Sequence, residues 1–369
     1  MKILYDYQQF TMQKYGGISR YLYEIITRIG KYKADEVKVL AGLYINQYLK
    51  NCDSGLVIGW QSPKIPKTGK MRKLVNYYLS RFWLSTHDKP DIIHETYYAS
   101  KSVMSQPCPT VITVHDMIHE KLNSFLSDKA KRLSLVKVNA INRADHVICV
   151  SNQTKKDLIE IFKIDPKKIT VIYHGYSFDI KDYQMLNVKI IKSPYILYLG
   201  LREGYKNFDR LLQAFASRNK LKNNFKLVCA GAKKFSTLEL DRIVELGLTE
   251  NNIKYVPADD QTIAQLYNGA SVFVYPSLYE GFGIPPLEAM AFSCPVACSR
   301  VSSIPEVVDN AAEFFDPYNI DSIADALEQV LFSSEKNKTL IRLGKERLKH
   351  FSWDTCAQKT YSVYSSLMS

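Results

Sequence analysis

Two glutamates, Glu280 and Glu288, lie in the stretch of the sequence whose residue types best suit a binding or catalytic site. The turn between them contains Gly281, Phe282 and Gly283, follows an apolar strand-like run, and leads into a pair of prolines that suit a helix start. A helix start presents free N–H groups and the positive end of the helix dipole, which together can seat a phosphate or a sugar hydroxyl. We therefore expect Glu288 in the first turn of this helix, close to that seat, and Glu280 at the strand end.

Carboxylates in these two places could bracket one elongated ligand. Glu288 could accept two hydrogen bonds from a vicinal diol such as a ribose, while Glu280 could reach the sugar side of the same nucleotide-sugar. Two plainer interpretations stay open: Glu288 could simply complement the helix dipole, and the loop could be an ordinary turn.

The first half of the chain is expected to form a sheet domain, because strand-like apolar runs alternate with amphipathic segments. Such alternation is typical of a parallel sheet wrapped by helices. Helices are expected at about Ile18–Ile29, Met71–Leu84, Asp128–Arg143 and after Ser151, which suits a helix cap.

The same alternation restarts after a polar, irregular linker at residues 181–194. Further helices are expected near Phe208–Ser217, Thr237–Leu246 and Gln261–Tyr267, and from Pro286. The fold class is therefore α/β, with an N-terminal Rossmann-like domain at residues 1–180 and a second one at 195–350. A C-terminal helix at 353–369 is expected to pack back on the first domain. Ligands of doubly wound sheets bind beyond the carboxyl ends of the strands, so two facing domains would form a cleft.

Composition and charge limit the class of protein. The 369 residues carry 49 Lys and Arg against 37 Asp and Glu, a formal charge of +12 that favours an anionic partner. The seven cysteines are scattered without zinc-type spacing, as expected for reduced thiols in a cytoplasmic protein. No stretch is long and apolar enough to suggest a signal peptide or a membrane span.

The segment YEGFGIPPLEAM resembles the signature of the retaining glycosyltransferases of family 4, a Glu, seven intervening residues and a second Glu. The likeness continues through VACSRVSSIPEVVDNAAEFFDP, ADHVICVSNQTKKDL and YGGISRY, so it covers nearly the whole chain. The resemblance implies the GT-B fold, in which two Rossmann-like domains face each other across a cleft.

The resemblance also gives meaning to Arg202 and Lys206, which follow a strand-like run in LYLGLREGYKNF. The matching cations of the family hold the donor diphosphate. Charge builds on this leaving group as the glycosidic bond breaks, and two preorganised cations can stabilise it as a metal would. The alternative is a solvated basic loop.

On the N-terminal side, Gly16 and Gly17 match a family loop that approaches the donor phosphates and the acceptor. Taken alone they fit many loops, and the dinucleotide fingerprint with three spaced glycines is absent. His115, at the end of TVITVHD, matches a family histidine near the transferred sugar. His119 follows it at a spacing that could suit a metal, but a third ligand is missing, as is any pair of aspartates separated by one residue. No metal and no cofactor are expected.

The resemblance implies transfer of a hexose from a nucleotide-diphosphate sugar with retention at the anomeric carbon. A GDP-mannose donor is the first expectation and a UDP-sugar the second, with a glycan or polyprenyl-diphosphate-linked acceptor of surface-polysaccharide synthesis. One alternative is a nucleotide-sugar epimerase of the same architecture. Another is a nucleic-acid-binding protein, which the basic balance allows but no binding motif supports, so no nucleic-acid partner is expected.

The segment from Pro63 to Lys89 suggests a second kind of contact. Seven cations stand against one acid, Asp88, along one probable basic helix, with aromatic side chains between them at Tyr77, Tyr78, Phe82 and Trp83. Such a helix could lie on the anionic inner face of the plasma membrane, beside a lipid-linked acceptor. Alternatively, the aromatics pack on the sheet and the cations are solvated.

Overall fold

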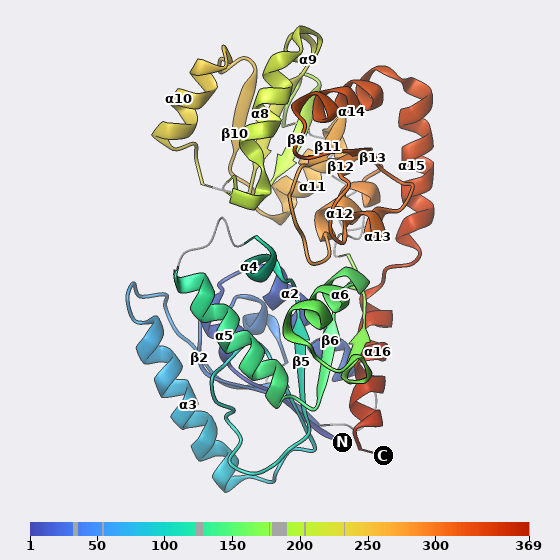
Figure 1. Cartoon of the computed structure of the whole chain (residues 1–369). Helices are drawn as coiled ribbons and strands as arrows, with labels where there is room; N and C mark the ends of the chain where they lie inside the picture. The colour runs from blue at the N-terminus through green and yellow to red at the C-terminus, as the bar shows by residue number, and fades with distance from the viewer. Residues whose placement is uncertain are drawn as a thin grey trace. The chain divides into compact units, whose positions relative to one another are not determined.

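The computed structural model describes residues 1–31, 36–53, 55–122, 128–176, 178, 190–202, 204–231 and 233–368. The chain divides into two compact units, Met1–Gly175 with Ser352–Ser369 and Tyr176–Phe351 (Figure 1). Residues 181–189 of the predicted linker lie outside the described residues. Each unit is an α/β domain with its own parallel sheet.

Unit 1 is built on a seven-stranded parallel sheet in the order β3-β2-β1-β4-β5-β6-β7. Its strands are β1 (Lys2–Tyr5), β2 (Glu36–Tyr44), β3 (Val57–Gln61), β4 (Ile92–Glu95), β5 (Thr110–Val114), β6 (His146–Cys149) and β7 (Ile169–Val171). Its helices are α1 (Gln8–Met12), α2 (Gly17–Ile29), α3 (Gly69–Thr86), α4 (Ile118–Lys121), α5 (Asp128–Arg143), α6 (Asn152–Phe162) and α16 (Trp353–Ser366). Short 3-10 turns lie at Tyr48–Asn51 and Pro166–Lys168.

Local sequence explains where the helices of unit 1 begin and which faces they bury. In α2, Tyr21, Leu22, Ile25, Ile26 and Ile29 recur at helical spacing and are buried. The prediction that Ser151 caps the next helix is confirmed, because its side chain accepts a hydrogen bond from the backbone N–H of Thr154.

The C-terminal helix α16, red in Figure 1, packs against α2 of unit 1. The chain passes close to the start of α16 at Gly175. A Cβ atom at this position would lie 2.3 Å from the backbone nitrogen of Trp353, so only glycine fits.

Unit 2 has a six-stranded parallel sheet in the order β10-β9-β8-β11-β12-β13. Its strands are β8 (Tyr195–Leu199), β9 (Lys226–Ala230), β10 (Ile253–Val256), β11 (Val272–Tyr275), β12 (Val296–Ser299) and β13 (Glu313–Phe315). Its helices are α8 (Phe208–Ser217), α9 (Asn219–Asn224), α10 (Thr237–Glu245), α11 (Asp260–Gly269), α12 (Ile284–Ala291), α13 (Ile304–Val308), α14 (Ile320–Phe332) and α15 (Ser334–Leu348), and a short 3-10 turn, η4, spans Gly204–Lys206.

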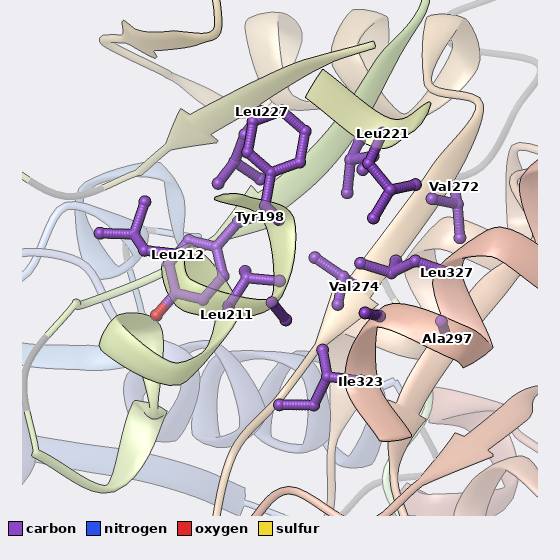
Figure 2. Close-up of a cluster of buried hydrophobic side chains, with 14 of the residues drawn as sticks. Tyr198, Leu211, Leu212, Leu221, Leu227, Val272, Val274, Ala297, Ile323 and Leu327 are labelled. Carbon is purple, nitrogen blue, oxygen red and sulfur yellow. The ribbon is translucent and has the colours of Figure 1, made fainter. Parts of the chain in front are cut away.

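Figure 2 shows the apolar core on one face of the unit 2 sheet. Strand residues such as Val272 and Val274 meet Leu211 and Leu212 of α8 and Leu327 of α14, all at most 2% exposed. Burial of these side chains fixes the helices against the sheet. The prediction of two Rossmann-like α/β domains is confirmed.

Five of the seven cysteines are buried, whereas Cys52 and Cys108 are partly buried. No helix in the described part of the chain combines the length and the apolar composition that crossing a bilayer requires.

Candidate active site

The sheet of unit 2 brings Lys206 and Glu280 together. Its first strand, β8, lies between β9 and β11, so the connections leave β8 and β11 in opposite directions and open a crevice at their carboxyl ends. Lys206 follows β8 and Glu280 follows β11, and their Nζ and Oε1 atoms are 2.7 Å apart. The backbone N–H of Leu278 also donates to the carbonyl of Tyr205 at 2.7 Å, which ties the two loops together.

The Lys206 ammonium is held in a mostly buried, aromatic setting. Its side chain is 17% exposed and that of Glu280 11%. The Nζ atom lies 5.0 Å from the ring centroid of Tyr205 and 5.7 Å from that of Tyr275. Burial by itself would lower the pKa of Lys206, but the neighbouring Glu280 carboxylate raises it above the ordinary value. Lys206 is therefore a fixed positive charge at the crevice of the sheet.

Two serines hold the backbone of the Glu280 loop. The Ser302 hydroxyl accepts a hydrogen bond from the N–H of Glu280, and the Ser303 hydroxyl donates to the carbonyls of Glu280 and Phe282, each at 2.9 Å. This role of Ser302 and Ser303 was not predicted from the sequence. The sequence does contain a feature that could have indicated it: the two serines directly precede Ile304 and Pro305, a pattern typical of the start of a helix.

The start of α12 offers fewer backbone N–H donors than predicted. Gly283 precedes the helix with a φ of 109°, in the left-handed region that favours glycine. Of the next three residues only Ile284 carries an N–H, because Pro285 and Pro286 have none. An anion bound here would depend on Lys206 and the glycine turn more than on the helix end.

The expectation that Glu288 lies in the first turn of this helix is wrong. The helix begins at Ile284, before the prolines, so Glu288 is its fifth residue and lies in the second turn. The residue is 7% exposed, and the Tyr267 hydroxyl donates to its Oε2 at 3.4 Å. Burial, with the nearby Glu288 carboxylate, raises the pKa of Tyr267 well above its ordinary value. The carboxylate is thus a mostly buried, oriented group.

Arg202 lies on the same loop as Lys206 but has a different partner. Its Nε donates to Oε1 of Glu239 at 2.6 Å, and its Nη2 donates to the carbonyls of Lys233 and Lys234 at 2.6 and 3.0 Å. The guanidinium also lies 4.7 Å from the ring centroid of Phe235, and the side chain is 4% exposed. Glu239 caps the start of α10, so Arg202 joins the loop after β8 to α10. A direct role of Arg202 at the diphosphate stays a prediction.

In unit 1, Gly16 and Gly17 form the start of α2. A Cβ atom at Gly16 would meet Oε1 of Gln13 at 2.4 Å, whereas a Cβ at Gly17 would meet nothing within 4 Å. Gly17 therefore borders open space, and a bound group can approach its backbone closely.

His115 follows β5 at the carboxyl end of the unit 1 sheet. Its ring lies edge-on to Tyr21 at 5.1 Å and is stacked with His174 at 6.0 Å, measured between centroids. Burial lowers its pKa to about 4; Asp116 opposes this shift and Lys137 adds to it. The imidazole is therefore neutral at neutral pH and can both donate and accept a hydrogen bond.

Other arrangements in the described ranges do not suggest a site. No group of three or more His, Cys, Asp or Glu side chains among these residues is placed to hold a metal ion. A hollow of about 740 Å³ beside α2 contains none of the predicted site residues. One of the side chains that line it, Arg28, already forms ion pairs with Glu24 and Asp354, and its Nε atom lies 2.8 Å from Oδ1 of Asp354.

Comparison with known proteins identifies the family. A family model for Glycosyltransferase Family 4 matches residues 15–179, and one for group 1 glycosyl transferases matches residues 184–347. The O-antigen chain mannosyltransferase B of Escherichia coli is 30% identical over 272 residues, which is 70% of each chain. The chain belongs to glycosyltransferase family 4 and is a glycosyltransferase.

Solved structures agree on the fold. Sucrose-phosphate synthase from Thermosynechococcus elongatus has a TM-score of 0.78 and 20% identity, with 100% of this chain and 99% of that chain covered. HepE from Anabaena, in complex with UDP-glucose, has a TM-score of 0.75 and 20% identity, and the match covers 99% of this chain and 100% of the HepE chain. The architecture is the GT-B fold that the sequence predicts.

Proposed function

We propose that this glycosyltransferase transfers a hexose, with retention of anomeric configuration, from a nucleotide-diphosphate sugar to a glycan or polyprenyl-diphosphate-linked acceptor in surface-polysaccharide synthesis. The observation that carries the proposal is the Lys206–Glu280 pair, 2.7 Å apart, where the connections of the unit 2 sheet diverge. A fixed cation in this place suits a diphosphate, and a neighbouring carboxylate suits sugar hydroxyls.

GDP-mannose is the proposed donor and a UDP-sugar the second choice. The similar Escherichia coli protein is named an O-antigen chain mannosyltransferase, which supports mannose and polysaccharide synthesis. HepE, more distant in sequence, was solved with UDP-glucose, which keeps the uridine donors in consideration.

The proposed reaction breaks the bond between the anomeric carbon and the diphosphate oxygen, and the bonding electron pair stays on that oxygen. Lys206 stabilises the charge that develops there. The acceptor hydroxyl oxygen forms its bond to the anomeric carbon on the same face, and its proton passes to the departing diphosphate. No protein nucleophile is needed.

The other site residues take binding roles in this proposal. Glu288 binds the ribose, Glu280 with Gly281, Phe282 and Gly283 holds the donor sugar, and the neutral His115 contacts the sugar at the reaction centre. Gly16 and Gly17 border the donor phosphates and the acceptor. Arg202 orders the loop that carries Lys206, and contact of its guanidinium with the diphosphate would require separation from Glu239.

A transfer assay tests the proposal. The protein is incubated with GDP-mannose or with UDP-sugars, in the presence and absence of a membrane extract as acceptor source. Release of nucleoside diphosphate is expected to require acceptor. The transferred sugar is expected to have the same anomeric configuration, α or β, as in the donor, which NMR coupling constants measure. A new nucleotide-sugar formed without acceptor would indicate an epimerase, and an inverted linkage would exclude the retaining mechanism.

Metal independence is a separate expectation. Because Lys206 supplies the positive charge at the leaving group, turnover should be unchanged when a chelator such as EDTA is present in excess of divalent ions. Initial rates with and without chelator, followed by added magnesium, measure this. Loss of activity that magnesium restores would show that a metal ion neutralises the diphosphate.

A further inference from the structure

The buried side chains of helix α3 in unit 1 are polar. Arg72, Asn76 and Ser80 recur every fourth residue and are its buried side chains. The Asn76 amide accepts from the N–H of Leu43 at 2.8 Å and donates to the carbonyl of Leu43 at 3.0 Å, which fastens the helix to β2. Arg72 donates to the carbonyl of Pro63 at 3.0 Å. A helix of a globular domain usually buries its apolar stripe instead, as α2 does.

The opposite face of α3 is apolar and exposed. Four large side chains at spacings of three or four residues lie on one side of the helix, and we call them the apolar face: Met71, Leu74, Tyr78 and Phe82, which are 62%, 56%, 63% and 68% exposed. Of the aromatic residues expected to face outward, Tyr77 and Trp83 are half-buried, and Trp83 stacks on His87 at 4.2 Å. A continuous apolar stripe left in water marks a surface that another apolar phase covers.

The charged residues of α3 and of the segment before it are of one sign. Between Ser62 and His87 the sequence contains no Asp or Glu. Five cations of this stretch are exposed, and we call them the basic rim: Lys64, Lys67, Lys70, Lys73 and Arg81. Arg72, expected to be part of the basic surface, belongs to the buried face instead. An occupant of this surface must therefore combine apolar and anionic groups.

An anionic lipid surface has both properties, since headgroup phosphates meet the cations and acyl chains receive the apolar side chains. A second copy of the chain fits less well, because two apposed basic rims would repel each other. Helix α10 offers a contrast within the same chain. Its Leu238 and Val244 are also exposed, but it carries Glu239, Asp241 and Glu245, which anionic lipid would repel.

We propose that α3 is a membrane-docking helix that lies in the plane of an anionic bilayer surface, with its apolar face at the boundary between headgroups and acyl chains and its basic rim against lipid phosphates. Figure 1 shows α3, in light blue, on the outside of unit 1. The proposal goes beyond glycosyl transfer, because it concerns where the enzyme works.

The test is co-sedimentation of the full chain with vesicles of phosphatidylcholine containing phosphatidylglycerol, and with vesicles of phosphatidylcholine alone. Binding is expected only with the anionic vesicles and should weaken as salt screens the charges. Reversing the basic rim, by replacing Lys64, Lys67, Lys70, Lys73 and Arg81 with Glu together, should lower the partition coefficient roughly a hundredfold or more. Replacing Leu74, Tyr78 and Phe82 with Gln should also abolish most binding, because Gln keeps helix propensity but removes the apolar area.

The matched control is Leu238→Gln with Val244→Gln on α10, which removes exposed apolar area of the same kind and should leave vesicle binding unchanged. Circular dichroism and thermal unfolding establish that every variant is folded. The proposal is overturned if the wild type stays in the supernatant with anionic vesicles at low salt, if the α3 variants bind as well as the wild type, or if Tyr78 and Phe82 instead mediate a dimer. Donor turnover with a water-miscible acceptor reports separately on the transferase.

Discussion

Replacing Lys206 with alanine is expected to lower kcat about a hundred- to a thousandfold, the range observed when one preorganised donor to a developing oxyanion is removed. The reason is geometric, since the ammonium is already fixed beside Glu280 at 2.7 Å and needs no reorganisation when the diphosphate departs. The apparent affinity for the donor should change less than kcat, because the charge to be stabilised is largest in the transition state. Steady-state rates at varied donor concentration separate the two effects.

The same substitution also breaks a mostly buried ion pair, and the two consequences must be told apart. Leaving Glu280 unpaired is expected to cost about 3–5 kcal/mol of folding free energy. The double variant Lys206→Met with Glu280→Gln removes both charges and should recover most of that stability in denaturant unfolding. Turnover should stay low in the double variant. Recovery of turnover together with stability would mean that the pair only supports the fold.

Regular elements were predictable from the sequence where apolar spacing is strong. Helices α2, α5 and α8 lie within a residue of their expected bounds, since each carries a clear pattern or a clear start. The short strand β3 and the five-residue helix α1 were not foreseen, because segments of this length carry too little periodicity to stand out.

At the candidate site, the sequence does not predict contacts that depend on how separate elements pack. The sequence places Lys206 and Glu280 after strand-like runs, but their pairing was not predicted, because it depends on β8 and β11 being neighbours in the sheet. It does not predict that Arg202 pairs with Glu239, since that contact depends on how α10 approaches the loop after β8. The position of Glu288 was misjudged because two prolines were taken to begin a helix that already begins at Ile284. For α3 the sequence left both alternatives open, because spacing alone does not tell which face of a helix meets the sheet; in the structure Tyr78 and Phe82 face outward.

Replacing Glu288 with glutamine is expected to weaken donor binding about ten- to a hundredfold, since hydrogen bonds to a charged group contribute about 1.5–3 kcal/mol. Gln keeps the volume of the side chain and can still accept from the Tyr267 hydroxyl, so the fold should be preserved at this 7% exposed position. The dissociation constant of the nucleoside diphosphate, by calorimetry, measures the effect. Tyr267→Phe is the matched control, because it removes the other partner in this contact and should reduce affinity less.

The proposal that Glu288 binds the ribose can be tested further by a double-mutant cycle, in which one change is made in the protein and the other in the ligand. The wild type should lose affinity when the nucleoside diphosphate lacks its ribose 2′ and 3′ hydroxyls, whereas Glu288→Gln should lose much less, because the interaction is already impaired. Such non-additivity would arise only if the carboxylate and the diol contact each other. Equal losses on both proteins would place the ribose elsewhere, and Glu288 would then act only as a buried partner of Tyr267 within unit 2.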